Sequence, residues 1–438
     1  MMDTIIPAYY KEYGMYSNAF RNFPLDIDGL KPVERRILLT AFLVAKEKLV
    51  KSARIEGTCM AKFHPHAGAY GTIVQMVNQG FLTGQGNFGF NLGVEPVGFA
   101  AQRYTECGMK KSTLDMAFRY LKHVDWVESE LDDEPEFLPT MFPFCLMGDK
   151  YTEGIGFGYR TVIPCYEVKD LYARLLWLIG KSQIKPTIKP ITDCIIDSNN
   201  EVLETLLTTG KAKIELHGVL KVNRGLCKAT VKSWPPGKKF ETILSKFKKE
   251  LDISDIGYMD LSNEDDGTNV SFSVLKQRNR DKIFSGFVSK LKTLLIGSVS
   301  FDIILSSKEE VVRKSVDSML LDTYNKFISV NDRMLRYEIA KANDSIVEFN
   351  NLEKLKGPLA QVLQAGQITK DNMSQKIGDL ARLSQLSTEI VNELITKYRI
   401  NKLFTVNTDT TNLQNKVVEC QVNLNDIQTF VLGQYNNI

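Results

Sequence analysis

The sequence lacks the marks of a membrane or secreted protein. No stretch of its 438 residues approaches the roughly 18 apolar residues that span a bilayer, and the N-terminus has no basic-then-apolar signal pattern. Its seven cysteines are odd in number and scattered, without a Cys-x-x-Cys pair for zinc or a redox disulfide. We therefore expect a reduced, cytoplasmic protein with no membrane partner.

Sites for ATP and for metal ions are also missing from the sequence. A phosphate-binding loop needs the pattern Gly-x-x-x-x-Gly-Lys-Ser/Thr, but Leu175 stands where the first glycine before Gly180-Lys181-Ser182 is required. Asp26 and Asp28 have the spacing of a carboxylate pair, yet they lead directly into a Gly-Leu-Lys-Pro sequence. We expect no metal site and no ATP site within the chain.

The composition is that of a globular protein of about two to four domains, with 43% hydrophobic and 24% charged residues. A net charge of +3 is too small to demonstrate a polyanionic partner. The charge is unevenly distributed, however, because basic residues prevail from Lys31 to Lys62 and acidic ones from Glu128 to Glu136. A solvated face and a nucleic-acid contact both remain open.

Residues 30–49 show the periodicity of an amphipathic helix. Apolar side chains recur at mostly three- and four-residue steps, at Val33, Ile37, Leu38, Ala41, Phe42 and Ala45. Arg35, Arg36 and Lys46 lie largely off this stripe, which predicts a helix with a basic side. A second helix is expected between His66 and Gly80, before a glycine-rich stretch, and this order is typical of a winged helix-turn-helix.

The middle of the chain mixes strand and helix patterns. Alternating apolar residues predict strands at Ala212, Ile214 and Leu216 and again at Val270, Phe272 and Val274. A lysine-rich helix is expected from Phe240 to Leu251, after a Pro-Pro-Gly turn. Together these patterns indicate an α+β domain.

Heptad spacing marks the final third of the chain. One series consists of Leu413, Val417, Cys420, Leu424, Ile427 and Val431. A compatible series consists of Leu320, Phe327, Val330, Met334 and Tyr337. Because the chain leaves along one such helix and returns along the other, we expect an antiparallel coiled-coil stalk (311–345 and 406–438) that carries a helical globule (346–405) for self-association. A helical bundle folded back on the body is the alternative.

Four local sequences carry a resemblance to a known family. They are Asp28-Gly29-Leu30-Lys31-Pro32-Val33 with Arg35-Arg36, His64-Pro65-His66, Gly84-Gln85-Gly86-Asn87-Phe88-Gly89, and Ala100-Ala101-Gln102-Arg103-Tyr104-Thr105-Glu106. In order and spacing they resemble the A subunits of gyrase and topoisomerase IV, the DNA-cleaving subunits of type IIA topoisomerases. The resemblance continues through Gly154-Ile155-Gly156 and the tail, and the compact length is similar to that of phage-encoded enzymes.

Tyr104 is the candidate nucleophile. A tyrosine that attacks phosphorus forms a phosphotyrosine, which stores the broken bond until the strand is resealed. Since a phenol has a pKa near 10, it needs a cation or a base nearby, and Arg103 is adjacent in sequence. Neighbouring side chains in an extended segment tend to point apart, and an isolated tyrosine is more often a packing or surface residue. The surrounding motifs favour the catalytic interpretation.

The resemblance implies further site residues. It places Arg21 on the scissile phosphate and gives His64 a hydrogen-bonding or proton-handling role; a surface cation and a turn-ordering residue are the alternatives. The DNA contacts that it implies are Lys31, Arg35, Arg36, His66, Gln85, Asn87 and Ile155. Ile155 would wedge between base pairs and bend the duplex, unless it merely covers the edge of a core.

The resemblance also implies an assembly. Two copies of this chain, joined through the globule as a C-gate, would act on double-stranded DNA with a partner subunit that supplies ATP hydrolysis and Mg²⁺. The expected division is a winged-helix cleavage domain with an N-terminal arm at 1–118, a tower domain at 119–310, and then the stalk and globule. A DNA-binding module with an inert Tyr104 and a structural coiled-coil scaffold are the other functions considered.

Overall fold

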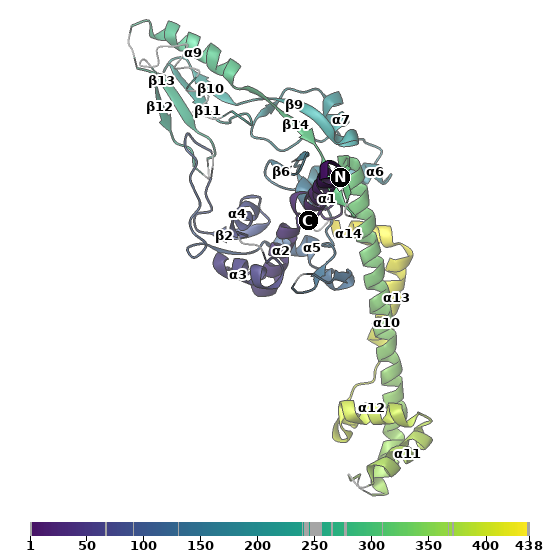
Figure 1. Ribbon diagram of the computed structural model, residues 1–438. Helices are drawn as coiled ribbons and strands as arrows, with labels where there is room; N and C mark the ends of the chain where they lie inside the picture. Colours follow the sequence, from purple (N-terminus) through teal and green to yellow (C-terminus); the bar gives the residue numbers. More distant parts are fainter. Residues whose placement is uncertain are drawn as a thin grey trace. The chain divides into compact units, whose positions relative to one another are not determined.

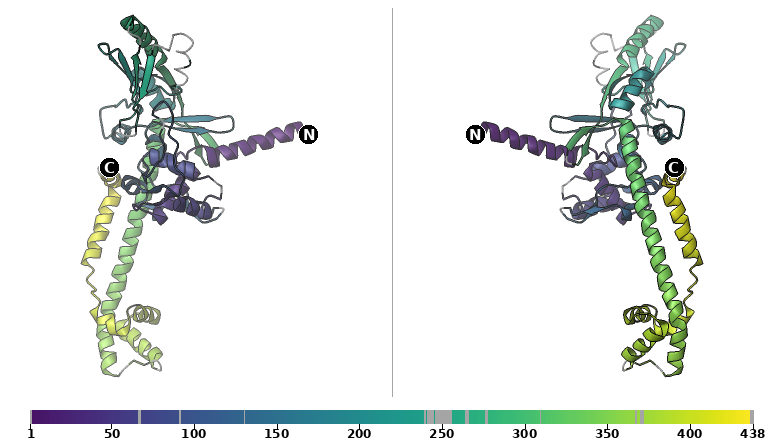
Figure 2. Two further views of the ribbon diagram at one scale, coloured as in Figure 1. Left: turned by 90° about the vertical axis from the view of Figure 1, so that its left-hand side faces the viewer. Right: turned by 90° about the vertical axis from the view of Figure 1, so that its right-hand side faces the viewer.

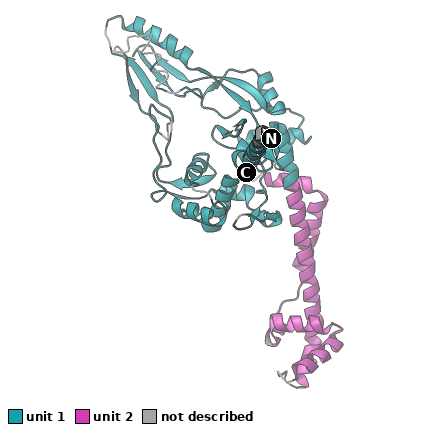
Figure 3. Ribbon diagram, viewed as in Figure 1, with its two compact units in different colours: residues 1–327, 438 teal, residues 328–437 magenta. Residues whose placement is uncertain are grey.

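The computed structural model describes residues 2–65, 68–90, 92–129, 131–238, 240, 245, 256–263, 266–275, 278–308, 310–366, 368–369 and 372–435. It divides into two compact units, one that extends to Phe327 and one from Ile328 to Asn437 (Figure 3). None of the helices in the described ranges combines the length and apolar character that a membrane crossing requires. The overall class is mixed α and β, as expected from the sequence.

The larger unit begins with a group of helices around a small sheet (Figure 1). Its elements are α1 (Met2–Ser17), the π-helical turn η1 (Asn18–Asn22), α2 (Pro32–Val44), β1 (Val50–Lys51), α3 (Ser52–Lys62), α4 (Tyr70–Asn78), β2 (Leu82–Gln85) and β3 (Glu106–Met109). The strands are antiparallel in the order β1-β3-β2. The helices expected at 30–49 and after His66 are therefore confirmed as α2 and α4, whereas α3 was not anticipated.

The sequence explains where α2 begins. Pro32 occupies the first helical position, where its missing N–H is not needed. The backbone N–H of Lys31 donates to Glu34 Oε2 at 2.8 Å, which satisfies a donor at the helix start. Ile37 and Leu38 are fully buried, so the apolar stripe faces the core as predicted.

A β-hairpin and several short helices connect this part to the next sheet. They are α5 (Lys111–Ala117), η2 (Leu121–His123), β4 (Trp126–Val127), β5 (Glu134–Pro135) and η3 (Phe144–Leu146). Strands β4 and β5 pair antiparallel, and the turn between them carries acidic side chains that include Asp132 and Asp133.

A five-stranded antiparallel sheet lies at the centre of the larger unit. Its strands, in the order β6-β7-β14-β9-β8, are β6 (Tyr151–Ile155), β7 (Arg160–Pro164), β14 (Ile296–Asp302), β9 (Lys211–His217) and β8 (Ile195–Ile196). Helices α6 (Val168–Leu178) and α7 (Asn200–Thr209) accompany it. The strand expected from Ala212, Ile214 and Leu216 is β9, and Ile214 and Leu216 share a buried core with Leu206 of α7.

A four-stranded antiparallel sheet follows. Its strands, in the order β10-β11-β13-β12, are β10 (Leu220–Asn223), β11 (Lys228–Val231), β13 (Val270–Val274) and β12 (Ile256–Asp260). Helix α9 (Arg280–Leu294) packs Phe284, Phe287 and Leu291 against this sheet, and a hairpin of β15 (Ile304–Ser307) and β16 (Glu310–Arg313) comes next. The predicted strand 270–274 is confirmed; the helix predicted from Phe240 to Leu251 lies almost wholly outside the described residues.

The smaller unit is helical. Its elements are the continuation of α10 (Val316–Gln364), α11 (Met373–Ser384), α12 (Thr388–Tyr398), η5 (Ile400–Thr405), α13 (Thr411–Asn425) and α14 (Ile427–Tyr435). Helix α13 lies beside α10 in Figure 1 and in Figure 2, and Lys416 Nζ bonds Glu338 Oε2 at 2.6 Å. Residues within 346–405 form a hydrophobic core around Leu359 and Leu380.

The heptad expectation needs one correction on α10. Tyr337 is 48% exposed, whereas Leu335 and Ala342 are buried. The inward face of α10 therefore does not continue through Tyr337. On the returning helix the prediction is better, because Cys420 and Val431 are both buried.

Candidate active site

Tyr104 stands on an exposed turn directly before β3. The side chain is 65% exposed, so its hydroxyl is open to a macromolecular substrate. The guanidinium carbon of Arg103 lies 4.6 Å from the centre of the Tyr104 ring, a cation–π contact. The structure thus brings these two neighbours together, although alternation along an extended segment would have separated them.

Buried hydrogen bonds hold the turn in place. The Thr105 hydroxyl, fully buried, donates to Ser52 Oγ at 2.8 Å and lies 2.8 Å from the Tyr70 hydroxyl. The Ser52 N–H donates to the Thr105 carbonyl at 3.0 Å, and the Ala53 N–H donates to the Gln102 carbonyl at 3.3 Å. The turn is consequently fixed against the N-terminal ends of α3 and α4, while the Tyr104 side chain projects from it.

His64 belongs to a second group of residues. Arg36 Nη1 lies 3.3 Å from His64 Nδ1, and Arg36 also forms a bidentate pair with Glu134, with Nε–Oε2 at 2.8 Å and Nη2–Oε1 at 2.7 Å. Arg36 and Glu134 are largely buried, at 16% and 14% side-chain exposure. Lys62 pairs with Asp132 on the same hairpin. The acidic run noted in the sequence therefore neutralises part of the basic run.

Tyr104 and His64 lie at opposite ends of α3. The Tyr104 turn contacts Ser52 and Ala53 at the start of this helix, and His64 follows its end. The ten steps from Ser52 to Lys62 rise about 15 Å along the helix at ~1.5 Å each. Within one chain, the contacts of the Tyr104 turn and the contact of His64 with Arg36 therefore lie at opposite ends of α3.

Lys31 and the η1 turn that carries Arg21 both bind the β6–β7 hairpin, which carries Ile155. Arg21 is exposed on η1, where the neighbouring Asn18 bonds the backbone of Phe157 at the hairpin turn. Lys31 Nζ donates to the Glu153 carbonyl at 2.9 Å. Ile155, at the end of β6, is 73% exposed. Ile155 is thus an exposed apolar side chain on a hairpin whose backbone binds Lys31 and the η1 turn that carries Arg21.

In the Asp28-to-Arg36 motif, Asp28 and Arg35 are buried and bind each other. Asp28 is fully buried, and its carboxylate accepts from Arg35 Nε at 2.7 Å, Arg35 Nη2 at 3.1 Å and the Leu138 N–H at 3.0 Å. Arg35 is itself buried, so the structure revises its expected role as a phosphate contact: its guanidinium holds the Asp28 carboxylate, which in turn binds the segment before η3 through Leu138. Gly29 adopts φ +70°, and a Cβ there would lie 2.8 Å from the backbone nitrogen of Phe144.

The remaining residues that were expected to contact DNA differ in whether their side chains are exposed and already hydrogen-bonded. Gln85 is exposed at the end of β2, opposite Glu106 of β3. Asn87 is exposed, but its amide already donates to the Gly98 carbonyl at 3.1 Å and accepts from the Gly89 N–H at 2.8 Å, so it orders the glycine-rich loop. His66 lies outside the described residues.

Sequence reasoning missed the residues that organise the site. Ser52, Tyr70 and Thr105 fix the Tyr104 turn, and Glu134 fixes Arg36, yet each of these bonds joins residues 35 or more positions apart. The only signal for Glu134 was its place in an acidic run. Such pairings need the tertiary structure.

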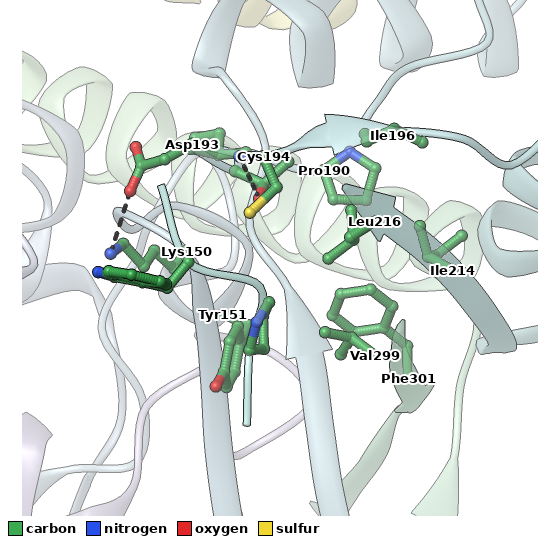
Figure 4. Close-up of a pocket in the computed structure, with 14 residues that line it drawn as sticks. Lys150, Tyr151, Pro190, Asp193, Cys194, Ile196, Ile214, Leu216, Val299 and Phe301 are labelled. Atoms are coloured by element: carbon green, nitrogen blue, oxygen red, sulfur yellow. Dashed lines mark hydrogen bonds and ion pairs between the residues drawn. The ribbon is translucent and has the colours of Figure 1, made fainter. Parts of the chain in front are cut away.

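A separate apolar pocket lies on the five-stranded sheet (Figure 4). Ile214, Leu216 and Phe301 line it, Cys194 adds a half-buried thiol, and Lys150 pairs with Asp193 at 3.2 Å at one side. Burial raises the pKa of the Cys194 thiol. The lining includes none of the site residues predicted from the sequence.

Comparison with known proteins identifies the family. The family model that describes the A subunits of DNA gyrase and topoisomerase IV matches residues 21–436. The DNA gyrase A subunit of Mycoplasma genitalium is 32% identical over 241 residues, covering 49% of this chain and 28% of that protein. The DNA topoisomerase 4 A subunit of Escherichia coli K12 is 34% identical over 219 residues, covering 47% of this chain and 28% of that protein. The DNA gyrase A subunit of Helicobacter pylori J99 is 27% identical over 380 residues, covering 79% of this chain and 44% of the relative.

The chain thus spans less than half the length of these relatives. All three are bacterial, and they lend no support to the phage origin suggested by compact length. The match of the family model covers most of the chain, including Tyr104 and both structural units. The chain belongs to the family of DNA gyrase and topoisomerase IV A subunits.

Proposed function

We propose that this chain is the DNA-cleaving subunit of a type IIA topoisomerase and that Tyr104 is its nucleophile. Attack by the phenolic oxygen forms a bond to phosphorus, breaks the bond to the 3′ oxygen and leaves a 5′-phosphotyrosine; resealing reverses these steps. The observation that carries the proposal is the combination of an exposed Tyr104 hydroxyl with a turn fixed by buried hydrogen bonds. Arg103, already at the ring, would stabilise charge on the phosphoryl oxygens.

A complete site requires a second copy of the chain. The Tyr104 turn and His64 adjoin opposite ends of α3, which is about 15 Å long at ~1.5 Å per residue, and this supports a site shared between two copies. In a homodimer, Tyr104 and Arg103 of one copy would face Arg21 and His64 of the other. The globule at 346–405, which has its own core, is the proposed C-gate contact between the copies at the tip of an antiparallel coiled-coil stalk.

DNA would lie across the first sheet and helices, which we interpret as a winged helix-turn-helix. Lys31 and Gln85 are the exposed candidates for phosphate and sugar contacts, with His66 as a further candidate. Ile155 on the β6–β7 hairpin would enter the base stack and bend the duplex, and the two larger sheets would form the tower domain.

The proposed reaction also needs a partner subunit. Among the described residues, no group of three or more His, Cys, Asp or Glu side chains comes together that could hold a metal ion. As the family resemblance implies, a partner would hold Mg²⁺ and hydrolyse ATP. Two copies of each protein would pass one duplex through another in the cytoplasm.

Trapping of the covalent adduct tests the role of Tyr104. Wild type, Tyr104→Phe and Tyr258→Phe chains are mixed with the partner subunit, Mg²⁺ and end-labelled DNA, then denatured and run on a gel. Tyr258 is a matched control because it is similarly exposed, at 52%, on β12. We expect adduct with wild type and Tyr258→Phe only. Equal adduct with Tyr104→Phe would remove Tyr104 from the mechanism, and no adduct in any sample would favour a DNA-binding module.

Mixed dimers test whether the site forms between two copies. Neither Tyr104→Phe nor His64→Ala homodimers should cut. A dimer with one chain of each kind contains one complete site if the site is shared between copies, and none if each chain forms its own. Restored nicking of supercoiled plasmid, confined to one strand, is therefore expected. Absence of nicking by purified mixed dimers would contradict the shared site.

A further inference from the structure

The loop that precedes the Tyr104 turn crosses to the four-stranded sheet. Its described residues, 90 and 92–99, follow the glycine-rich sequence, and we call them the strap. Two backbone hydrogen bonds close the base of the strap: the Phe90 N–H donates to the Val97 carbonyl at 3.0 Å, and the Val97 N–H donates to the Phe90 carbonyl at 2.8 Å. The strap is therefore a closed, hairpin-like excursion from the chain.

The tip of the strap is hydrogen-bonded to the sheet. The Val94 N–H donates to Asp260 Oδ2 at 2.6 Å, and the Thr268 hydroxyl donates to the Leu92 carbonyl at 2.8 Å. Asp260 is the last residue of β12 and Thr268 lies just before β13, so two neighbouring strands hold the tip. Val94 also packs against the hydrophobic core of this sheet.

Asp260 and Gly93 are suited to this close contact. A Cβ on Gly93 would collide with Asp260 Oδ2, so glycine allows the strap to approach the carboxylate. The Ser262 N–H donates to Asp260 Oδ1 at 3.0 Å and orients the carboxylate. Loss of hydration tends to raise the pKa of Asp260, but the hydrogen bonds from Val94 and Ser262 prevail and lower it. Asp260 is therefore an ionised acceptor at neutral pH, which strengthens its bond to the strap.

The base of the strap leads into the contacts that fix Tyr104. The Ala100 N–H donates to the Asn87 carbonyl at 2.9 Å, and the Tyr70 hydroxyl donates to the Ala100 carbonyl at 2.8 Å. The same Tyr70 hydroxyl lies 2.8 Å from that of Thr105, directly after Tyr104. A displacement of the strap is thus transmitted to the Tyr104 turn through Ala100 and Tyr70.

We propose that Asp260 is a positioning residue for DNA cleavage: by holding the strap, it ties the Tyr104 turn to the four-stranded sheet. The inference rests on the proposed function and adds to it a residue remote from the reacting atoms. Asp260 acts through Val94 and does not contact the phosphate. Because a displacement of about 1 Å can cost a catalytic group about 100-fold in rate, a second anchor for the turn matters when bound DNA loads it.

Hydrogen exchange of the DNA-free chain tests the contact itself. The double variant Asp260→Ala/Thr268→Val removes both side chains that bind the strap, and Gly93→Val blocks the approach while leaving the sheet unchanged. In both, the Val94 amide should exchange about tenfold or more faster than in wild type, while the Phe272 amide in β13 keeps its protection. Equal exchange of Val94 in wild type and Gly93→Val would overturn the inference.

Asp266→Ala is the matched control. Asp266 is exposed on the turn between β12 and β13, and its bonds are to Asn263. Its replacement removes the same charge as Asp260→Ala, so Val94 exchange and cleavage should both equal those of wild type. Faster Val94 exchange in this control would assign the effect to the charge of the turn and contradict the specific role of Asp260.

Cleavage by the full assembly, with its partner subunit, tests the positioning role. At saturating DNA, the double variant and Gly93→Val should cut about tenfold or more slowly with unchanged DNA affinity. Asp260→Asn keeps an acceptor oxygen, although a neutral one, and should remain within about threefold of wild type. Wild-type rates in both released variants would remove Asp260 from the reaction, and faster cutting would show that the strap inhibits.

These outcomes differ from failure of the proposed function. Adduct formation by Tyr104→Phe would remove the nucleophile but would leave the exchange of the Val94 amide as expected. The exchange measurement reports on the strap without DNA or cleavage. Loss of the cleavage effect with Val94 exchange altered as expected would instead limit the strap to a structural role and refute the positioning role of Asp260.

Discussion

Arg174 offers the sharpest test of what holds the larger unit together. Its side chain is fully buried on α6, and every N–H of the guanidinium donates a hydrogen bond. Nε and Nη2 bind Asp317 at 2.8 and 2.7 Å, Nη1 and Nη2 bind Glu204 at 3.1 and 2.7 Å, and Nη1 binds the Pro186 carbonyl at 2.8 Å. One residue thereby joins α6, α7 and the start of α10.

Replacement by methionine keeps the volume but leaves two carboxylates without their cation. Removal of one partner from a buried ion pair typically costs about 3–5 kcal/mol. At about 2 °C per kcal/mol for a large unit, Arg174→Met should lower Tm by about 6–10 °C. Arg313→Met is the control, since Arg313 forms a bidentate pair with Asp302 but is half exposed; it should cost no more than about 1 kcal/mol.

Tryptophan fluorescence is the assay, because Trp126, Trp177 and Trp234 are the three tryptophans and all lie in the larger unit. Acidification adds a second test. Burial tends to raise the pKa of Glu204, but hydrogen bonds from Arg174 and Lys185 prevail and lower it below its usual 4.5. A lowered pKa in the folded state stabilises the protein above pH 4.5, and this contribution is lost as pH falls through the folded value.

The difference in Tm between wild type and Arg174→Met should therefore be largest above pH 4.5 and shrink below it. Two results would refute the reasoning: a Tm within about 1 °C of wild type, or a difference that grows on acidification. Neutralisation of both carboxylates in Arg174→Met, by Glu204→Gln and Asp317→Asn, should recover part of the loss, since the unpaired buried charges are then gone.

The other predictions concern a turn, the exposed wedge and a DNA contact. Gly29→Ala combines a left-handed φ with a clash against the backbone, and it should lower the free energy of unfolding in urea by about 2–4 kcal/mol. The control Gly71→Ala lies in α4 with open space around it and should raise that free energy by about 0.5–1 kcal/mol. Similar values for the two variants would contradict the argument. Ile155→Ala should change stability by less than about 0.5 kcal/mol but reduce DNA bending measured by energy transfer between labelled duplex ends. Lys31→Gln should lower the log–log salt slope of DNA affinity by about 0.9 per chain, and an unchanged slope would exclude a phosphate contact.

Several helices and strands could be predicted from the sequence because the periodicity of their apolar residues matches the face that is buried in the structure. The stripe that includes Ile37 and Leu38 became the buried face of α2, and the alternation at Ile214 and Leu216 became β9. Both segments place their apolar residues at the spacing of a single secondary structure. Helix α3 was missed because its buried apolar positions, such as Ile55 and Cys59, are few and Gly57 interrupts the segment.

The sequence motifs single out candidate site residues but do not give their arrangement in space. The motifs led to Tyr104, and the turn before β3 leaves it exposed. They did not show that the Tyr104 turn and His64 adjoin opposite ends of α3, because a motif does not tell which end of a helix its residues will contact in the fold. In the sequence, Arg35 is as plausible a DNA contact as Arg36. Only the folded structure shows that Arg35 is buried in an ion pair with Asp28.

Counting charges along the sequence does not predict the local net charge in the folded protein, and the reason is physical. From Lys31 to Lys62 the basic residues exceed the acidic ones, but ion pairs engage four of them with Asp28, Glu134, Glu106 and Asp132. Three of these carboxylates come from more than 50 residues away, so the local excess largely disappears in three dimensions. A low overall charge is then compatible with DNA cleavage, provided that the few unoccupied cations stand at the phosphates. Specific placement around Tyr104, Lys31 and the β6–β7 hairpin, rather than a broad positive field, is the arrangement that the geometry favours.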